Sequence, residues 1–292
     1  MNSKKESTNR FFRVFCALPE REIEAHVSVS FSSTIDLSAV EAVRAEAAQA
    51  GERKPSYTAF VIKAVSRALR EYPYANRRVF RSPWRLGGPW LHSFGHADIT
   101  VAAERDVPGR EYIAFVDVLR AADSQSLDEI NAWLAALARS DEESNQQWRE
   151  FSSLIRRLPW RLTALILRLP AWIPSWWERY RGAAVLVSSP AKYGVGSVTA
   201  TWAWPIGISF GFVQPKPVVR DGEVVVRPCF EFLMNFDRRV MAGAAAAKFF
   251  KRVCELIEAG DEGRLQNPAP DNVPEAMGQG SWPNENQEED AG

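Results

Sequence analysis

Few side chains in this 292-residue chain could transfer a proton near neutral pH. Its histidines are His26, His92 and His96, which lie far apart in the sequence. A histidine acts as a base most readily when a carboxylate orients its ring, and His92 has no acidic residue at motif spacing. The three cysteines are equally scattered and offer no ligand spacing for zinc. The sequence therefore predicts neither a catalytic unit centred on one of these histidines nor a metal site.

A second candidate for a catalytic or binding site is the segment Asn235–Gly243, which has the sequence NFDRRVMAG. A guanidinium stays protonated at any physiological pH, so Arg238 in this segment cannot accept a proton. Its positive charge could attract an anion such as a carboxylate or a phosphate. The alternative, which we favour, is that Arg238 turns to solvent or pairs with a nearby acid such as Asp237.

Composition narrows the class of protein. Hydrophobic residues make up 46% of the chain, enough for one large core or two modest ones. Basic and acidic residues both number 36, which argues against a nucleic-acid binder that relies on neutralising phosphates. Cys16, Cys229 and Cys254 lack paired spacing, which favours reduced thiols, and the polar N-terminus shows no signal peptide. We therefore expect a cytoplasmic protein.

The chain divides into three parts by composition. Residues 1–15 are expected to be flexible, and residues 16–265 to form a single domain. Residues 266–292 carry acidic side chains, no lysine or arginine, and many proline, asparagine, glutamine and glycine residues. Such a tail cannot support a core and is expected to be disordered. It keeps the protein solvated or, alternatively, binds a partner.

Strand and helix patterns interleave along the central domain. Alternation over Ala25–Ile35 predicts a half-buried strand, after which Asp36 can cap a helix over Leu37–Ala50. Pro55 and Ser56 open a second predicted helix. The further expected elements are the helices Tyr57–Glu71, Ser126–Arg139 and Ala244–Ala259, the strands Asp98–Ala103, Tyr112–Val118, Ala183–Val187, Val198–Val213 and Glu223–Asn235, and a turn at Asp106–Gly109. This irregular alternation predicts a mixed α/β sandwich.

Five motifs follow one another in the order known from one enzyme family. They are Tyr57–Asn76 with its Pro73 and Asn76, His96–Ile99, Arg120–Leu127, Gly182–Gly194 and Asn235–Gly243. The series resembles the acyltransferase component of 2-oxoacid dehydrogenase complexes and covers roughly residues 25–258. The resemblance implies a chloramphenicol acetyltransferase-like, mixed-sheet α/β sandwich that assembles as a homotrimer with active sites at subunit boundaries.

The last motif resembles the family signature Asp-His-Arg-Val-x-Asp-Gly with its chemistry removed. In the family, the His is the general base and the Asp four residues later supports the site. Here Arg238 occupies the His position and Ala242 the Asp position. Loss of a general base usually slows the chemical step by roughly 10²–10⁴. The resemblance therefore implies a pseudoenzyme. It further implies that Asp237 and Arg239 form a structural charge pair and that Gly243 is a turn residue.

Ser188 matches the family serine whose hydroxyl donates a hydrogen bond to the oxyanion of the tetrahedral intermediate. One such donor is worth about 10²–10³ in rate. The alternative is that Ser188 and Ser189 only satisfy backbone groups at a strand end.

Residues 150–181 form an insertion rich in tryptophan and arginine. Its arginines recur at helical spacing beside a stripe of leucines: Arg157, Arg161 and Arg168 beside Leu158, Leu162, Leu165 and Leu169. The charge-free runs are far shorter than the ~20 residues that span a bilayer, and Pro159, Pro170 and Pro174 are expected to break the segment into short rods. We favour a lid packed on its own sandwich or on a neighbouring subunit. Contact of residues 154–177 with an anionic membrane surface, or a channel for a long acyl chain near Ser188, stay open.

The resemblance implies coenzyme A or acyl-CoA as a possible substrate, no covalently bound cofactor, and a homotrimer that meets an acylated carrier. Because the recognisable chain starts almost at the catalytic domain, we expect any lipoyl arm to come from another protein. Two other functions stay open. One is a non-catalytic binding or assembly subunit that holds an acylated ligand, a partner or a membrane surface. The other is an active enzyme whose acceptor, such as a neutral amine, needs no protein base.

Overall fold

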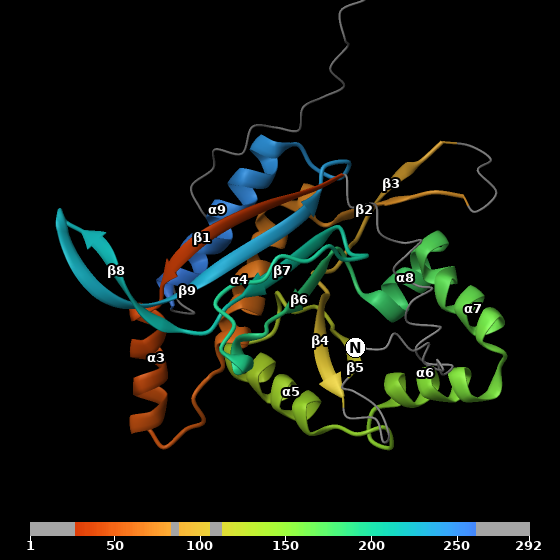
Figure 1. Ribbon diagram of the computed structural model, residues 1–292, viewed down its shortest axis with the longest axis horizontal. Coiled ribbons are helices and arrows are strands. Elements are labelled where there is room, and N and C mark those ends of the chain that lie inside the picture. Colours follow the sequence, from red (N-terminus) through yellow and green to blue (C-terminus); the bar gives the residue numbers. More distant parts are fainter. Residues whose placement is uncertain (1–26, 83–87, 106–112, 261–292) are drawn as a thin grey trace, which may run out of the picture.

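A computed structural model describes residues 27–82, 88–105 and 113–260. Within these ranges, seven strands form one mixed sheet in the order β1-β9-β7-β6-β4-β5, with β8 paired to the outer part of β9 (Figure 1). The strands are β1 (Ser28–Asp36), β4 (Ile99–Arg105), β5 (Ile113–Leu119), β6 (Val185–Ser188), β7 (Ile206–Phe210), β8 (Gln214–Arg220) and β9 (Glu223–Asp237). The β4–β6 and β6–β7 pairs are parallel, and the remaining pairs are antiparallel.

Four helices accompany the main sheet: α3 (Ser38–Gln49), α4 (Tyr57–Glu71), α5 (Leu127–Arg139) and α9 (Gly243–Ala259). Helix α4 lies deepest and packs against α9 and α5. It begins where the sequence predicts, because the Ser56 hydroxyl accepts a hydrogen bond from the Ala59 N–H at 3.2 Å. Its apolar side chains meet Phe232 and Phe236 of β9 and Phe249 of α9 in one core. The result is the mixed α/β sandwich that the element pattern predicts.

The insertion consists of three helices, α6 (Gln146–Arg157), α7 (Trp160–Trp172) and α8 (Pro174–Arg181). Pro159 and Pro174 separate them, as predicted, but Pro170 lies inside α7 and does not end it. Beside the insertion lies a separate hairpin of β2 (Arg77–Phe80) and β3 (Trp90–Ser93). Trp177 of α8 is fully buried against this hairpin, with the Arg78 guanidinium 3.8 Å from its ring centroid. In the described ranges, no helix is long and apolar enough to cross a membrane.

One predicted strand is wrong over most of its length. Residues 198–213 were expected to form a strand, but only β7 is extended. The preceding segment folds back over β7 instead: the Ser209 hydroxyl donates to the Val198 carbonyl at 2.7 Å, and the Phe212 N–H donates to the Val195 carbonyl at 3.1 Å. Trp202 in this segment lies directly over Gly207 of β7.

Other differences are smaller. The strands β2, β3 and β8 have no counterpart among the elements predicted from the sequence. The prolines Pro215 and Pro217 are tolerated in β8 because it is an edge strand. Asp36 does accept a hydrogen bond from the Ser38 N–H at the start of α3, at 3.0 Å. Short 3₁₀ turns cover Pro73–Ala75 and Ala191–Tyr193. Residues 1–26, the turn 106–109 and the tail 266–292, on which further predictions fall, lie outside the described residues.

The close packing of the segment that folds back over β7 can be tested by measuring the stability of the protein. A Cβ on Gly211 would lie 1.8 Å from the Gly196 carbonyl oxygen, a backbone atom that cannot rotate away. We expect Gly211→Ala to lower the free energy of unfolding by about 1–3 kcal/mol, measured by urea denaturation. Gly243→Ala is the control, because a Cβ there meets nothing within 4 Å and should be neutral or slightly stabilising. Equal effects of the two substitutions would contradict this account of the segment.

Candidate active site

Ser188 is the last residue of β6, where it lies beside Ser209 of β7 in parallel register. It is half-buried, and none of the described groups forms a hydrogen bond with its hydroxyl. The adjacent Ser189 behaves differently. Its hydroxyl donates to the Phe210 carbonyl at 2.7 Å and accepts from the Ala191 N–H at 3.2 Å. The backbone role considered for both serines therefore belongs to Ser189, while the Ser188 hydroxyl keeps its hydrogen-bonding capacity for a ligand.

Arg238 follows the C-terminal end of β9 and points to solvent. Its backbone N–H donates to the Val27 carbonyl at 3.0 Å, which fixes the main chain but not the side chain. Of the two alternatives expected for Arg238, the solvent-facing one is observed, and the pairing with Asp237 does not occur. Asp237 is occupied by Arg239, whose Nη2 lies 2.7 Å from the carboxylate and whose backbone N–H donates to it at 2.9 Å. The predicted Asp237–Arg239 charge pair is confirmed.

Ala242 is the residue immediately before α9 and adopts an extended conformation, with φ −71° and ψ 159°. This is the N-cap position, where Asp, Asn, Ser or Thr would accept a hydrogen bond from the first turn. Ala242 has no side-chain acceptor, so this end of α9 is uncapped. α9 begins at Gly243, as predicted, but Gly243 is itself helical and does not adopt the left-handed conformation of a turn glycine.

One chain does not bring Ser188 and Arg238 together. In the sheet, Ser188 aligns with Ser209, and Ser209 aligns with Leu233 of β9. Arg238 lies five residues beyond Leu233. At about 3.3 Å per residue, this separates the two positions by roughly 16 Å along the strands alone. The two candidate residues therefore lie at opposite ends of the sheet.

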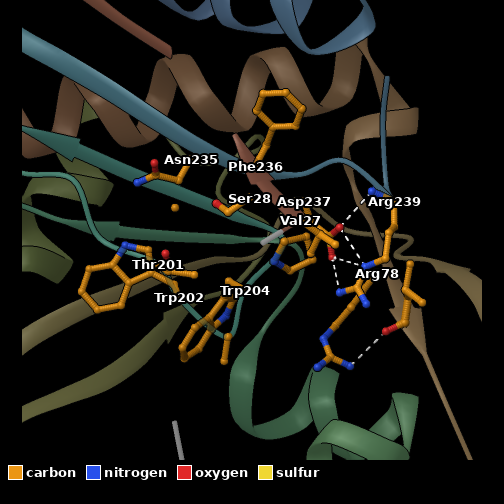
Figure 2. A pocket seen from close by; sticks show the side chains of 14 residues that line it. Val27, Ser28, Arg78, Thr201, Trp202, Trp204, Asn235, Phe236, Asp237 and Arg239 are labelled. Atoms are coloured by element: carbon orange, nitrogen blue, oxygen red, sulfur yellow. Dashed lines mark hydrogen bonds and ion pairs between the residues drawn. The ribbon is translucent and has the colours of Figure 1, made fainter. Parts of the chain in front are cut away.

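A small pocket opens at the Arg238 end of the sheet (Figure 2). Asp237, Arg239 and Arg78 line one side of it, and Trp202 and Trp204 lie on the other. Its volume is about 50 Å³, which admits water molecules but not an acyl chain. The pocket therefore does not by itself form a substrate site.

The surroundings of His92 differ from those expected from the sequence. It was expected to lack an acidic partner, but its Nε2 lies 2.8 Å from Oε1 of Glu178 in α8. The two residues are 86 positions apart, so no motif search could pair them. His96 is exposed, and its backbone carbonyl accepts a hydrogen bond from the Asn76 amide at 2.9 Å. His26 lies outside the described residues.

No cluster of potential metal ligands occurs in the described part of the chain, and neither cysteine that it contains forms a disulfide. Burial raises the pKa of Cys229 and raises that of Cys254 to about 12. Both thiols therefore stay protonated near neutral pH and are poor nucleophiles.

The protein family described as "2-oxoacid dehydrogenases acyltransferase (catalytic domain)" matches this chain over residues 21–153 and 177–263, which together make up more than half of it. The chain belongs to this family. The match skips residues 154–176, which fall within the insertion of α6, α7 and α8.

Similar proteins agree with this assignment. A pyruvate dehydrogenase dihydrolipoyllysine-residue acetyltransferase component from Staphylococcus epidermidis is 24% identical over 211 residues, covering 70% of this chain and 39% of its own length. The chain thus spans about two fifths of that relative. A probable dihydrolipoamide acetyltransferase from Listeria monocytogenes superposes with a TM-score of 0.62 at 18% identity, covering 91% of this chain and 98% of its own. The expected acetyltransferase-like sandwich is confirmed.

The dihydrolipoamide acetyltransferase of Azotobacter vinelandii superposes with a TM-score of 0.62 at 20% identity, covering 90% of this chain and 94% of its own. That structure concerns the role of one serine, one histidine and one asparagine in the catalytic mechanism, the last two four positions apart. Arg238 and Ala242 are also four positions apart.

The assignment of Ala242 as the uncapped N-terminus of α9 can be tested by introducing a capping side chain. We expect Ala242→Asp to raise the free energy of unfolding by about 0.5–2 kcal/mol, because the carboxylate accepts an N–H of the first turn and faces the positive end of the helix dipole. Ala247→Asp, at an exposed position further along α9, is the control and should destabilise slightly. Urea denaturation measures both. No gain from Ala242→Asp would mean that residue 242 is not the N-cap.

Proposed function

We propose that this protein is an acyltransferase-family domain in which CoA-linked acyl transfer is strongly weakened or lost. One observation carries the proposal: the residue after Asp237 is the exposed Arg238, whose guanidinium cannot take a proton from a thiol or hydroxyl. Ala242 supports it, because it has no group that could orient a base. Ser188 keeps a free hydroxyl and remains as a possible oxyanion donor.

We further propose that the protein functions as a homotrimer. The separation of Ser188 from Arg238 within one chain supports this, since a site that contains both needs two copies. In such an assembly, Ser188 of one copy faces Arg238 of the next. The acyl donor would be acyl-CoA or an acylated carrier, and the family relationship supports no finer choice.

The alternative function is a non-catalytic binding or assembly subunit. It is favoured by what the chain keeps: the core around α4, the Asp237–Arg239 pair and the sheet are intact although the base position is not. Such a subunit would hold an acylated ligand or a partner without turning it over.

Restoration of the motif tests the leading proposal. Wild type, Ser188→Ala and the double variant Arg238→His with Ala242→Asp are mixed with acetyl-CoA or a longer acyl-CoA and an acceptor, and release of free CoA thiol is followed. We expect wild type to match Ser188→Ala, and the restored motif to gain roughly 10²–10⁴ in rate.

Turnover of wild type clearly above that of Ser188→Ala would overturn the loss of catalysis. An unchanged rate in the restored variant would favour the binding or assembly subunit.

The His92–Glu178 pair supports a second candidate, namely acyl transfer with a relocated base. The carboxylate 2.8 Å from Nε2 is the orienting partner that a basic imidazole needs. The hairpin that carries His92 also touches the motif segment, because Arg77 Nη2 donates to the Val240 carbonyl at 3.1 Å.

For this candidate, we expect His92→Gln to lower acyl-CoA turnover by roughly 10²–10⁴. His96→Gln is the matched control, because His96 is exposed and belongs to the same hairpin region. Equal rates for His92→Gln, His96→Gln and wild type would rule out the relocated base.

A further inference from the structure

Helix α7 turns two of its leucines to solvent, which is unusual for a helix that packs only on its own protein. The buried positions are small or polar, namely Thr163, Ala164 and Pro170. Leu162 and Leu165 point outward with 43% and 48% of their surface exposed. A surface helix normally turns its leucines to the core. Leu162 and Leu165 of the predicted leucine stripe therefore do not pack on the sandwich of the same chain, while Leu158 and Leu169 are half-buried.

The exposed apolar surface continues past the end of α7. Ile173 is 37% exposed and Trp176 is 40% exposed. Figure 1 shows α7 at the periphery of the molecule, beside α8 and far from β1 and β9. Leu162, Leu165, Ile173 and Trp176 are called the outer face below. Exposed apolar groups on two helices in contact with each other are candidates for a binding surface.

The helices of the insertion carry an excess of positive charge, although Arg156 is paired with Glu142. Residues 146–181 contain seven arginines and only two carboxylates, in a chain whose formal net charge is +0. Arg157 and Arg161 are exposed and flank the leucines, and neither forms an ion pair with any described residue. Of the five tryptophans in this stretch, Trp176 is exposed, whereas Trp148 and Trp177 are buried. Exposed leucines beside exposed arginines, with an exposed tryptophan at the next helix, form the pattern of a segment that lies in the headgroup region of an anionic bilayer.

We propose that α6, α7 and α8 dock the protein peripherally on an anionic phospholipid membrane through the outer face. The leucines and Trp176 enter the boundary between headgroups and acyl chains, while Arg157 and Arg161 bind lipid phosphates. With 13 residues, α7 is too short to span a bilayer, so it lies along the surface.

Charge argues for lipid over another copy of the chain. In a two-fold contact between two outer faces, arginines would face arginines, which costs free energy. A contact of the outer face with a different surface of another copy is tested below by the oligomer mass. An acidic protein would satisfy the arginines but would not need exposed leucines. An anionic bilayer provides both acyl chains and negative charge. The family match skips most of this segment, so the surface belongs to this chain and not to the general family domain.

Vesicle co-sedimentation of the full-length chain tests the proposal. We expect binding to vesicles of phosphatidylcholine with phosphatidylserine, weaker binding to phosphatidylcholine alone, and loss of binding as salt rises. Arg157→Gln with Arg161→Gln should lower the partition coefficient about 25-fold, since each arginine near an anionic surface contributes about fivefold. Leu162→Ser with Leu165→Ser should lower it at least about tenfold.

Two matched controls remove the same groups elsewhere. Val224→Ser with Val226→Ser removes apolar side chains that are 72% and 71% exposed on β9, and Lys248→Gln with Lys251→Gln removes exposed cations of α9. Both should bind vesicles like wild type. Equal loss in the controls and in the α7 variants, or no preference for phosphatidylserine, overturns the proposal. So does a fall in oligomer mass by light scattering in the leucine variant, because the face would then be an interface between copies.

Discussion

One buried carboxylate holds together the segments on which the rest of the domain depends. Asp98, at the start of β4, accepts the Arg120 Nη1–H at 2.6 Å and the Ala121 N–H at 2.8 Å. These hydrogen bonds stabilise Ala121 in the left-handed backbone conformation, with φ 44°, which residues other than glycine rarely adopt. Arg120 in turn donates to the carbonyls of Glu178 and Arg179 at the end of α8. A single carboxylate thus joins β4, the turn after β5 and the last turn of the insertion.

This junction explains how the chain can carry three extra helices without disturbing Ser188. The Arg181 carbonyl accepts hydrogen bonds from the Thr100 hydroxyl at 2.6 Å and from the Trp204 indole at 2.7 Å. Gly182 follows with φ 70°, and a Cβ there would lie 2.9 Å from the Thr100 hydroxyl. The chain therefore enters β6 along one fixed path. Whatever α6 and α7 contact, the strand that ends at Ser188 begins in the same place.

Local signals made much of this arrangement predictable from the sequence. Helix α4 has its predicted bounds, and α5 follows the Ser126 cap, because each depends on neighbours within a few residues. The motifs around Asp98 and Arg120 were recognised, but not the contact between them. The His92–Glu178 pair and the outward leucines of α7 were missed because they depend on packing between distant segments. A leucine stripe fixes which residues share a face, and only tertiary structure decides whether that face meets the core.

The two residues that we propose to have replaced the catalytic pair are residues that the fold does not need. Arg238 and Ala242 are exposed, and neither side chain forms a hydrogen bond or ion pair with the described residues. Their neighbour Asp237 is bound by Arg239, and its backbone N–H donates to the Pro205 carbonyl at 2.9 Å, which ties β9 to the start of β7. Substitution of Asp237 would disturb the sheet, whereas substitution of residue 238 or 242 changes only chemistry and one helix cap. An acyltransferase sandwich can therefore lose its base with little cost in stability, so an intact fold is not evidence of an intact reaction.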